Sequence, residues 1–239
     1  MLSIDIIVPV YNPEGYLEEA LSSAILQTYK GSYQIIVVDD GSTEEIAPII
    51  AAVQKKWGRK NVTISLIFSH ENRGAAYARN LGIQNSASDL IFFHDADDVM
   101  HEKRLLITLK HSQRDPKLML ACGNFQRIVN NFINPIPKFL QPPKLSSEMA
   151  LQQWPIACGS VAIRRKALQQ TGLFKEDYEI GEDYDLWLRF FQQFPGQMKY
   201  IHEVLYYYRY QATEASLTKR FAGTARHLDI YMELQKKYG

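Results

Sequence analysis

The segment Asp95-Ala96-Asp97 places two carboxylates two positions apart, directly after the apolar run at residues 90–93. In a turn at the end of a strand such side chains can converge, and converging carboxylates repel unless a cation lies between them. Carboxylate oxygens suit Mg²⁺ or Mn²⁺, and Mg²⁺ commonly takes one or two carboxylates together with substrate phosphates. The segment therefore predicts a metal ion bound with a phosphorylated ligand. The alternative is that Asp97 or Asp98 only caps the following helix.

A second acidic segment, Asp39-Asp40-Gly41-Ser42, follows the apolar run at residues 34–38. One interpretation is a tight turn, with Gly41 at positive φ and Ser42 capping the next helix. The other is that a carboxylate accepts a hydrogen bond from a ring N–H of a nucleobase. The residues alone leave both interpretations open.

A third acidic group, Glu182, Asp183 and Asp185, lies in the first turn of a helix expected over residues 182–191. Acidic residues interact favourably with the helix dipole there, which explains their presence without a functional role. The functional interpretation is that one of them is a general base. Such a base must lie within about 3 Å of the proton that it removes, and an ordinary Asp, with a pKa of about 3.9, is ionised at neutral pH.

Arg73 and Gly74 precede a helix expected over residues 74–84, and Arg79 lies within it. Backbone N–H groups at a helix start, with a guanidinium nearby, suit a phosphate. The alternative is a solvated arginine and a glycine packed against a neighbour. His94, polar at the end of an apolar run, is interpreted as a satisfied, half-buried histidine, with a substrate hydrogen bond as the alternative.

The elements that must position these residues alternate along the first half of the chain. Strands are expected at 4–10, 34–38, 62–68 and 90–93. Three helices are expected between them: one that is capped by Asn12 and has Pro13 in its first position, one over 44–57 and one over 74–84. Apolar runs without clean alternation are typical of a parallel sheet covered by helices, hence an α/β fold. Ligands bind at the carboxyl ends of such strands, where Tyr11 and two of the acidic segments lie.

The second half is less regular. Five prolines in residues 130–155 predict a long loop. A strand is expected at 157–163, another at 204–210 and a helix at 224–238. The consecutive tyrosines at 206–208 are interpreted as partly core. The loop either folds onto its own core or contacts a membrane surface through its apolar side chains, which are Phe132, Ile133, Ile136, Phe139 and Leu140.

Composition sets the broad class. The 239 residues carry 27 Lys and Arg against 26 Asp and Glu and are 46% hydrophobic, which fits a globular chain and excludes a disordered or coiled-coil one. The near-zero net charge argues against a nucleic-acid partner. Cys122 and Cys158 are too few for a disulfide scaffold or a four-ligand zinc site and indicate a cytoplasmic setting. No signal peptide or membrane-spanning run is expected.

Five segments in order, IDIIVPVYN, IIVVDDGS, ENRGAAYARNLGI, FFHDADD and GEDYDLWLR, resemble a family 2 glycosyltransferase. The resemblance implies one GT-A domain over residues 1–239, with a Rossmann-like, mostly parallel sheet flanked by helices. Within it, residues 1–100 would form the nucleotide-binding half, 101–215 the acceptor-binding half and 216–239 a C-terminal helix.

The resemblance also implies the reaction, which is an inverting transfer of a sugar from a nucleoside diphosphate sugar, most often a UDP-sugar, with Mn²⁺ or Mg²⁺. The acceptor would be a hydroxyl of a saccharide or a lipid-linked saccharide, in cell-surface polysaccharide or glycolipid synthesis. The enzyme would act in the cytoplasm or at the inner face of the membrane.

Site residues carry over by position, as the resemblance implies. The nucleotide side would comprise Pro9, Tyr11, Asp39, Asp40, Arg73, Arg79 and Asp95. Asp97 would bind the metal, with Asp95 touching the metal or the ribose. Asp183 would be the catalytic base. The acceptor and sugar side would comprise Glu182, Gly159 and Ser160.

The sequence departs from the family pattern at two places. His94 precedes the metal motif, where the family usually has an apolar residue, and Gln211 stands where members often carry a histidine near the pyrophosphate. Arg209, Lys219 and Arg220 are candidates to replace that histidine.

Two other functions are compatible with this fold class. A non-catalytic relic that binds nucleotide sugars is disfavoured because Asp95, Asp97 and Asp183 are all present. A nucleotidyltransferase is disfavoured because the N-terminal region has no glycine-rich loop with a lysine.

Overall fold

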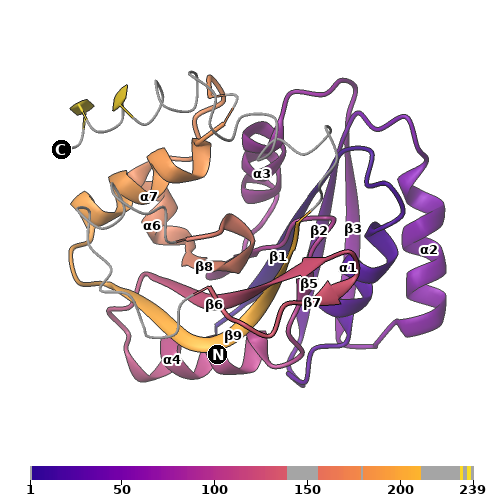
Figure 1. Ribbon diagram of the computed structural model, residues 1–239, viewed down its shortest axis with the longest axis horizontal. Helices are drawn as coiled ribbons and strands as arrows, with labels where there is room; N and C mark the ends of the chain where they lie inside the picture. The colour runs from indigo at the N-terminus through magenta and orange to yellow at the C-terminus, as the bar shows by residue number, and fades with distance from the viewer. Residues whose placement is uncertain (1, 139–155, 179, 211–231, 234–235, 238–239) are drawn as a thin grey trace.

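A computed structural model describes residues 2–138, 156–178, 180–210, 232–233 and 236–237 (Figure 1). A mixed nine-stranded sheet runs through the molecule in the order β3-β2-β1-β4-β8-β6-β9-β5, with β7 paired to β6. The strands are β1 Ile4–Val10, β2 Tyr33–Asp40, β3 Val62–Ser69, β4 Leu90–Phe93, β5 Val99–Met100, β6 Leu120–Val129, β7 Phe132–Ile133, β8 Val161–Arg164 and β9 Met198–Tyr210. The α/β architecture predicted from the sequence is confirmed.

The first four strands form the parallel half of the sheet. β1 lies between β2 and β4, and β3 pairs with the outer side of β2, all in parallel. Because successive side chains point to opposite faces, Ile7 packs with Ala76 and Ile83, whereas Ile6 and Val8 join the core on the other face. Burial on both faces explains why the strand sequences lack alternation.

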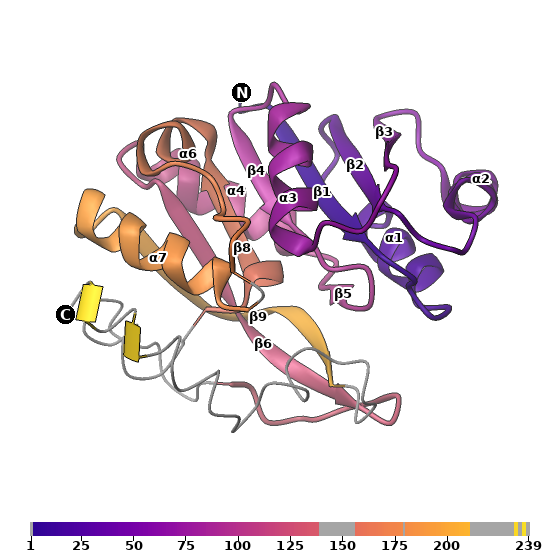
Figure 2. The same cartoon turned by 90° about the horizontal axis from the view of Figure 1, so that it is seen from above.

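Six helices are described, and the two large core clusters divide them between the two faces of the sheet. α1 Leu17–Ile25, α2 Ile46–Trp57 and α4 Arg104–Arg114 contribute to one cluster. α3 Ala75–Gln84, α6 Arg165–Thr171 and α7 Glu182–Gln193 cover the other face, where α6 and α7 lie over the second half of the sheet (Figure 2). The result is a three-layer arrangement.

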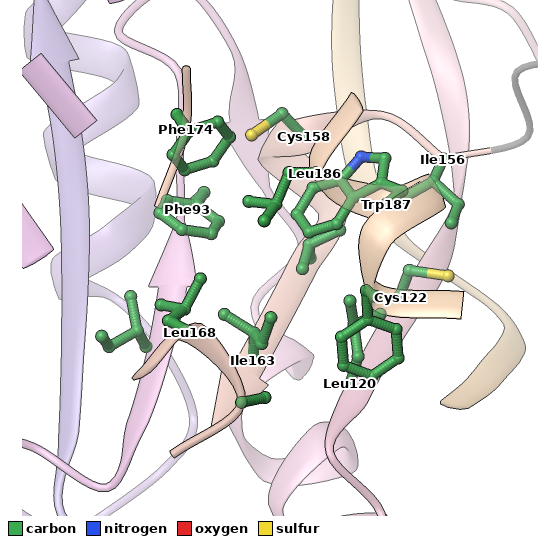
Figure 3. Close-up of a cluster of buried hydrophobic side chains, with 14 of the residues drawn as sticks. Phe93, Leu120, Cys122, Ile156, Cys158, Ile163, Leu168, Phe174, Leu186 and Trp187 are labelled. Carbon is green, nitrogen blue, oxygen red and sulfur yellow. The ribbon is translucent and has the colours of Figure 1, made fainter. Parts of the chain in front are cut away.

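The core beneath α7 determines where the acidic first turn of that helix lies. Trp187 is buried against Phe174, with ring centroids 6.2 Å apart, and Phe174 in turn packs edge-on against Phe93 at the end of β4 (Figure 3). Cys158, buried and unpaired, belongs to the same cluster. Apolar packing therefore ties α7 to the end of β4, although the two are far apart in the sequence.

The second half of the sheet mixes strand directions. β8 is antiparallel to both β4 and β6, while β9 runs parallel to β6 and antiparallel to the short β5. β9 begins at Met198, six residues before the predicted start. The predicted strand at 157–163 begins instead with a 3₁₀ turn, Cys158–Ser160, and only then enters β8.

Two predicted helix starts are wrong. α1 begins at Leu17, not after Asn12, because Pro13 accepts a turn hydrogen bond from the Tyr16 N–H. Asn12 adopts φ 43°, and its side-chain oxygen accepts a hydrogen bond from the Thr43 N–H at 2.9 Å. Ser42 caps no helix either, since α2 begins at Ile46 and the Ser42 hydroxyl accepts from the Asn12 N–H. These residues join two loops.

The predicted loop at 130–155 is described only to residue 138, and this part contains the short strand β7, which pairs with β6. Most of the predicted C-terminal helix lies outside the described residues. Phe132, Ile133 and Ile136 are exposed, Phe132 at 79%. Phe139 and Leu140 lie outside the described residues. In the part of the chain that the structure describes, no helix has the length and apolar character needed to cross a membrane.

Candidate active site

The acidic turn that follows β4, residues 95–98, gives its three carboxylates different surroundings. Asp95 accepts a hydrogen bond from Arg79 at 2.9 Å, and Asp98 accepts one from the backbone N–H of Arg209 at 2.6 Å. Among the described residues, no other residue donates a hydrogen bond to the Asp97 carboxylate. Neither Asp97 nor Asp98 caps α4, which begins at Arg104.

The Asp97 carboxylate thus has no hydrogen-bond donor from another described residue. Burial, followed by the neighbouring charge of Asp95, raises the pKa of Asp97 to about 6, and the charge of Arg209 opposes the rise. Burial likewise raises the pKa of Asp98, with Asp97 as the next cause. A cation beside Asp97 would lower the pKa of Asp97 again, because an opposite charge favours the ionised form.

The donor set fits a divalent cation that is shared with a ligand. No cluster of three or more His, Cys, Asp or Glu side chains placed to hold a metal occurs in the described ranges. One free carboxylate, with a second nearby, matches the way Mg²⁺ and Mn²⁺ sit between one or two protein oxygens and phosphates. Asp97 and Asp95 are the residues that would hold such an ion.

Arg79 connects the acidic turn to α7. From α3, its guanidinium lies 2.9 Å from Asp95 and 2.7 Å from the Glu182 carboxylate, and its side chain is 8% exposed. Both terminal nitrogens thus serve carboxylates of the protein, and Nε, also buried, has no partner among the described residues. Contact of Arg79 with a nucleotide stays a prediction.

Asp183 lies next to this bridge, at the start of α7. Gly181 takes the left-handed conformation, φ 88°, immediately before the helix, so that Glu182 and Asp183 occupy its first turn. Asp183 accepts a hydrogen bond from the Tyr184 N–H at 2.7 Å. Burial raises the pKa of Asp183 to about 7, with the Glu182 charge adding to the rise and Arg79 opposing it. A carboxylate with a pKa near neutrality suits a general base.

The end of β2 is held by its own backbone contacts. Asp39 accepts a hydrogen bond from the Ser42 N–H at 2.9 Å, and Asp40 accepts from the N–H groups of Arg73 and Gly74, the latter at 2.7 Å. Asp40 therefore holds the segment that leads into α3, which begins at Ala75. Burial raises the pKa of Asp40, and these two N–H groups oppose the rise.

Gly41 lets the two loops meet. It has φ 76°, as predicted, and a Cβ there would lie 2.7 Å from the backbone of Glu71. Pro9 is half-buried and Tyr11 is 50% exposed at the neighbouring end of β1. The carboxyl ends of β1 and β2 thus form the surface on which a nucleobase was predicted.

Arg73 is engaged by protein groups. Its guanidinium stacks 3.8 Å from the centre of the Tyr77 ring and lies 3.2 Å from the Glu176 carboxylate. The side chain remains half-exposed. A phosphate contact by Arg73 stays a prediction.

Gly159 and Ser160 lie in the 3₁₀ turn before β8. A Cβ at Gly159 would collide with the Tyr206 hydroxyl, and that hydroxyl accepts the N–H of Asp95 at 3.2 Å. Ser160 is buried and donates to the Ala157 carbonyl at 2.8 Å. The absence of a side chain at Gly159 thus leaves room for the Tyr206 hydroxyl next to Asp95. The sequence had assigned Tyr206 only to the core.

His94 is completely buried, not half-buried as predicted. Its Nε2 lies 3.0 Å from the Ala20 carbonyl of α1, and its ring packs edge-on against Tyr206. Burial lowers the pKa of His94 to about 4, which leaves the ring neutral. The backbone contact satisfies Nε2 only, since the buried Nδ1 has no hydrogen-bond partner among the described residues, so the prediction of a satisfied histidine holds for one ring nitrogen.

Two buried arginines, Arg104 and Arg209, contact the acidic turn or the end of β4; the sequence named Arg209 as a candidate near the pyrophosphate but did not single out Arg104. Arg104 lies between the rings of Phe92 and Tyr206 and donates to the carbonyls of Phe93 and Val161. Burial lowers the pKa of Arg104 to about 10. A charged residue inside an amphipathic helix pattern was the only sequence signal.

Arg209 is engaged by protein groups, and its predicted contact with the pyrophosphate stays a prediction. Its guanidinium donates to the Asp97 backbone carbonyl and to the side chains of Asn131 and Glu19. Gln211 and the other two candidates, Lys219 and Arg220, lie outside the described residues.

Comparisons with known proteins address the family and the fold of the chain. The family model described as Glycosyl transferase family 2 matches residues 5–172. An uncharacterized glycosyltransferase of Rickettsia conorii is 32% identical over 187 residues, which cover 77% of this chain and 29% of that protein. The Escherichia coli enzyme UDP-Glc:alpha-D-GlcNAc-diphosphoundecaprenol beta-1,3-glucosyltransferase WfgD is 28% identical over 185 residues, covering 77% of this chain and 68% of its own length.

Solved structures share the fold. Staphylococcus aureus TarS 1–349 in complex with UDP-GlcNAc superposes with a TM-score of 0.77 at 18% identity, covering 99% of this chain and 65% of that one. The mannosyltransferase PcManGT from Pyrobaculum calidifontis, in complex with GDP-Man and Mn²⁺, superposes with a TM-score of 0.72 at 18% identity. The superposition covers 100% of this chain and 65% of that one. At such identities the likeness concerns the fold alone.

The family match ends before α7, so the position of Asp183 beside the acidic turn comes from the structure. The chain spans only 29% of the length of the Rickettsia conorii relative. The matched residues nonetheless make up most of the chain and contain the β2 turn, the start of α3 and the acidic turn. The chain belongs to glycosyl transferase family 2, as its five sequence segments predicted.

Proposed function

We propose that this domain transfers a sugar from a UDP-sugar to a hydroxyl group, with inversion at the anomeric carbon. The observation that carries the proposal is the Arg79 bridge, which joins Asp95 of the acidic turn to Glu182 of α7. Through it, the predicted metal ligands and the predicted base belong to one cluster. An inverting transfer needs that combination, a charged leaving group on one side and a base on the other.

The donor would occupy the carboxyl ends of β1, β2 and β4. Pro9, Tyr11 and Asp39 would hold the nucleobase, and Asp97 and Asp95 would hold Mn²⁺ or Mg²⁺ beside the diphosphate. When bound, the metal ion neutralises negative charge on the leaving diphosphate. Asp40 would act indirectly, by fixing the start of α3 with Arg73 and Gly74.

Asp183 would accept the proton of the acceptor hydroxyl as its oxygen bonds to the anomeric carbon and the bond from that carbon to the diphosphate breaks. One displacement inverts the configuration, so no covalent sugar–enzyme intermediate forms. Glu182, Gly159 and Ser160 would line the sugar and acceptor side. The raised pKa of Asp183 supports its role, since a base near neutrality holds a transferred proton well.

The relatives indicate the substrate class. WfgD is named for transfer of glucose from a UDP donor to a lipid-linked acceptor, and TarS was solved with UDP-GlcNAc. A UDP-hexose or UDP-N-acetylhexosamine and a saccharide or lipid-linked saccharide are therefore proposed here, in polysaccharide or glycolipid synthesis at the cytoplasmic face of a membrane. PcManGT, with GDP-Man and Mn²⁺, supports the choice of metal and makes a GDP donor the alternative.

A donor screen tests the proposal. UDP-, GDP- and dTDP-sugars are incubated with the protein and Mn²⁺, and released nucleotide is measured with and without EDTA. We expect metal-dependent release of UDP from a UDP-sugar, and this release should be slow when no acceptor is present. Release from GDP-sugars alone would move the proposal to that nucleotide. No release, and no shift of Tm by any nucleoside diphosphate with Mn²⁺, would overturn it.

A further inference from the structure

Arg209, at the end of β9, is held by more contacts than a structural ion pair needs. Its side chain is only 5% exposed and lies over the Tyr16 ring, with the guanidinium carbon 4.4 Å from the ring centre. One terminal nitrogen donates to Glu19 of α1 and the other to the side chain of Asn131 in the turn after β6. The guanidinium is therefore fixed from three directions.

Two further donors of Arg209 reach the acidic turn. Nε donates to the carbonyl oxygen of Asp97 at 2.7 Å, and the backbone N–H donates to the Asp98 carboxylate at 2.6 Å. Three residues earlier on the same strand, the Tyr206 hydroxyl accepts the N–H of Asp95. The end of β9 thus contacts the backbone or side chain of each acid in the turn.

We propose that Arg209 is a positioning residue that orients the Asp97 carboxylate for a divalent cation. It acts on the peptide group of Asp97 and leaves the carboxylate itself free. The proposal rests on the proposed function, because it concerns the ion that Asp97 would hold.

Charge explains why the turn needs such a residue. Three carboxylates within four residues repel one another, and the turn would relax outward unless cations and hydrogen bonds hold it. Arg79 restrains the Asp95 side and Arg209 restrains the Asp97–Asp98 side. A turn held in shape before the ion arrives binds it at a lower ordering cost.

Arginine and lysine should differ at this position. Lysine keeps the charge, but it lacks the planar fork that reaches Asp97, Asn131 and Glu19 together. Groups that orient metal ligands from outside typically change metal affinity by roughly 10- to 100-fold when they are removed. We expect Arg209→Lys and Arg209→Gln to weaken Mn²⁺ binding in this range while retaining UDP affinity measured without metal.

Two variants serve as matched controls. Arg127→Gln removes an exposed arginine from the neighbouring strand β6. Glu19→Gln removes the charged partner of Arg209 but leaves its hydrogen bond to Asp97. Both should retain the wild-type Mn²⁺ affinity, because neither changes the contact to the acidic turn.

Mn²⁺ affinity is measured by the electron paramagnetic resonance signal of free Mn²⁺, with and without UDP, alongside Tm and circular dichroism. Wild-type protein that binds no Mn²⁺ with UDP would refute the proposed function itself. If the wild type binds and Arg209→Lys binds equally well, Arg209 does not position Asp97. If both Arg209 variants fail to fold, or Glu19→Gln weakens Mn²⁺ as much as they do, Arg209 is a structural residue only and the inference is wrong.

Discussion

Arg79 and Glu182, 103 positions apart in the sequence, lie 2.7 Å from each other across the site. The same guanidinium holds Asp95 at 2.9 Å, so one buried cation compensates an acid from each half of the chain. The bridge is a direct polar contact between α3 and α7, and it adds to the apolar cluster that the two helices share.

Replacing Arg79 should damage both stability and activity. Arg79→Met leaves Asp95 and Glu182 as uncompensated charges, and breaking a buried pair by removing one partner typically costs about 3–5 kcal/mol. Arg79→Lys keeps the charge but reaches fewer acceptors, so it should lose less stability and less activity than Arg79→Met. Denaturant unfolding and donor turnover measure the two effects. Wild-type stability in Arg79→Met would show that the bridge is not a structural element.

Asp183→Asn should abolish sugar transfer while nucleotide binding persists. The amide cannot accept the proton, and loss of a general base typically costs about 10²- to 10⁴-fold in rate. The affinity for UDP in the presence of Mn²⁺, measured by calorimetry, should equal that of the wild type within experimental error. Asp177→Asn, an exposed carboxylate preceding the same helix, is the control and should have normal activity. Parental turnover by Asp183→Asn would remove Asp183 from the role of base.

The rate of transfer should rise with pH through about 7. Asp183 has a pKa raised to about 7 in the folded protein and must be ionised to accept a proton. Activity should therefore fall tenfold for each pH unit below this value and level off above it, provided that no other group titrates. The measurement is kcat/KM between pH 5.5 and 8.5 with saturating metal. A profile that is flat across this range would assign the base to another group.

Asp97→Asn should stabilise the metal-free protein above pH 6. The pKa of Asp97 is raised to about 6 in the folded state. Its carboxyl group therefore stabilises the folded state fully at a pH below the ordinary Asp pKa of about 3.9, and this contribution is lost as pH rises through about 6. At pH 8 the neutral amide relieves the buried charge, so Tm should increase by a few degrees, and the gain should shrink as pH falls.

The same Asp97→Asn variant should lose the increase in Tm that Mn²⁺ and UDP give the wild type. Ligand at 100 times its dissociation constant stabilises by about 2.7 kcal/mol, which is readily seen by calorimetry. Retention of the full Mn²⁺ effect in the variant would show that the metal does not need Asp97.

Gly159→Ala should reduce activity by displacing Tyr206. The new methyl group overlaps the Tyr206 hydroxyl, and overpacking of a buried site costs about 1–3 kcal/mol. Combining it with Tyr206→Phe, which removes the colliding oxygen, should recover part of the stability but not the hydrogen bond to Asp95. A double-mutant cycle by thermal unfolding measures the coupling. Strictly additive losses would mean that the two residues act independently, and Tyr207→Phe serves as the control on the same strand.

Much of the parallel half could be predicted from the sequence because its signals are local. Apolar runs such as residues 4–10 and 90–93 match β1 and β4 at both ends. The Asn12 and Ser42 cap predictions failed because a side chain that suits a helix start can equally accept a hydrogen bond from another loop, which only the folded chain supplies. In the second half, β9 extends well before its tyrosines because pairing with β6, not local pattern, sets its start.

The five segments in their order by themselves determined the family of this chain. The sequence also predicted where the polar turns lie, because the carboxyl ends of parallel strands meet at one edge of the sheet. Tertiary structure alone decided which acid is free and which is restrained. Arg79 and Arg209 come from elements far from Asp95 and Asp97, and they reach those acids only after the two halves pack. Burial and charge compensation depend on neighbours in space, so no local pattern encodes that Asp97 stays unpaired while Asp95 and Asp98 do not.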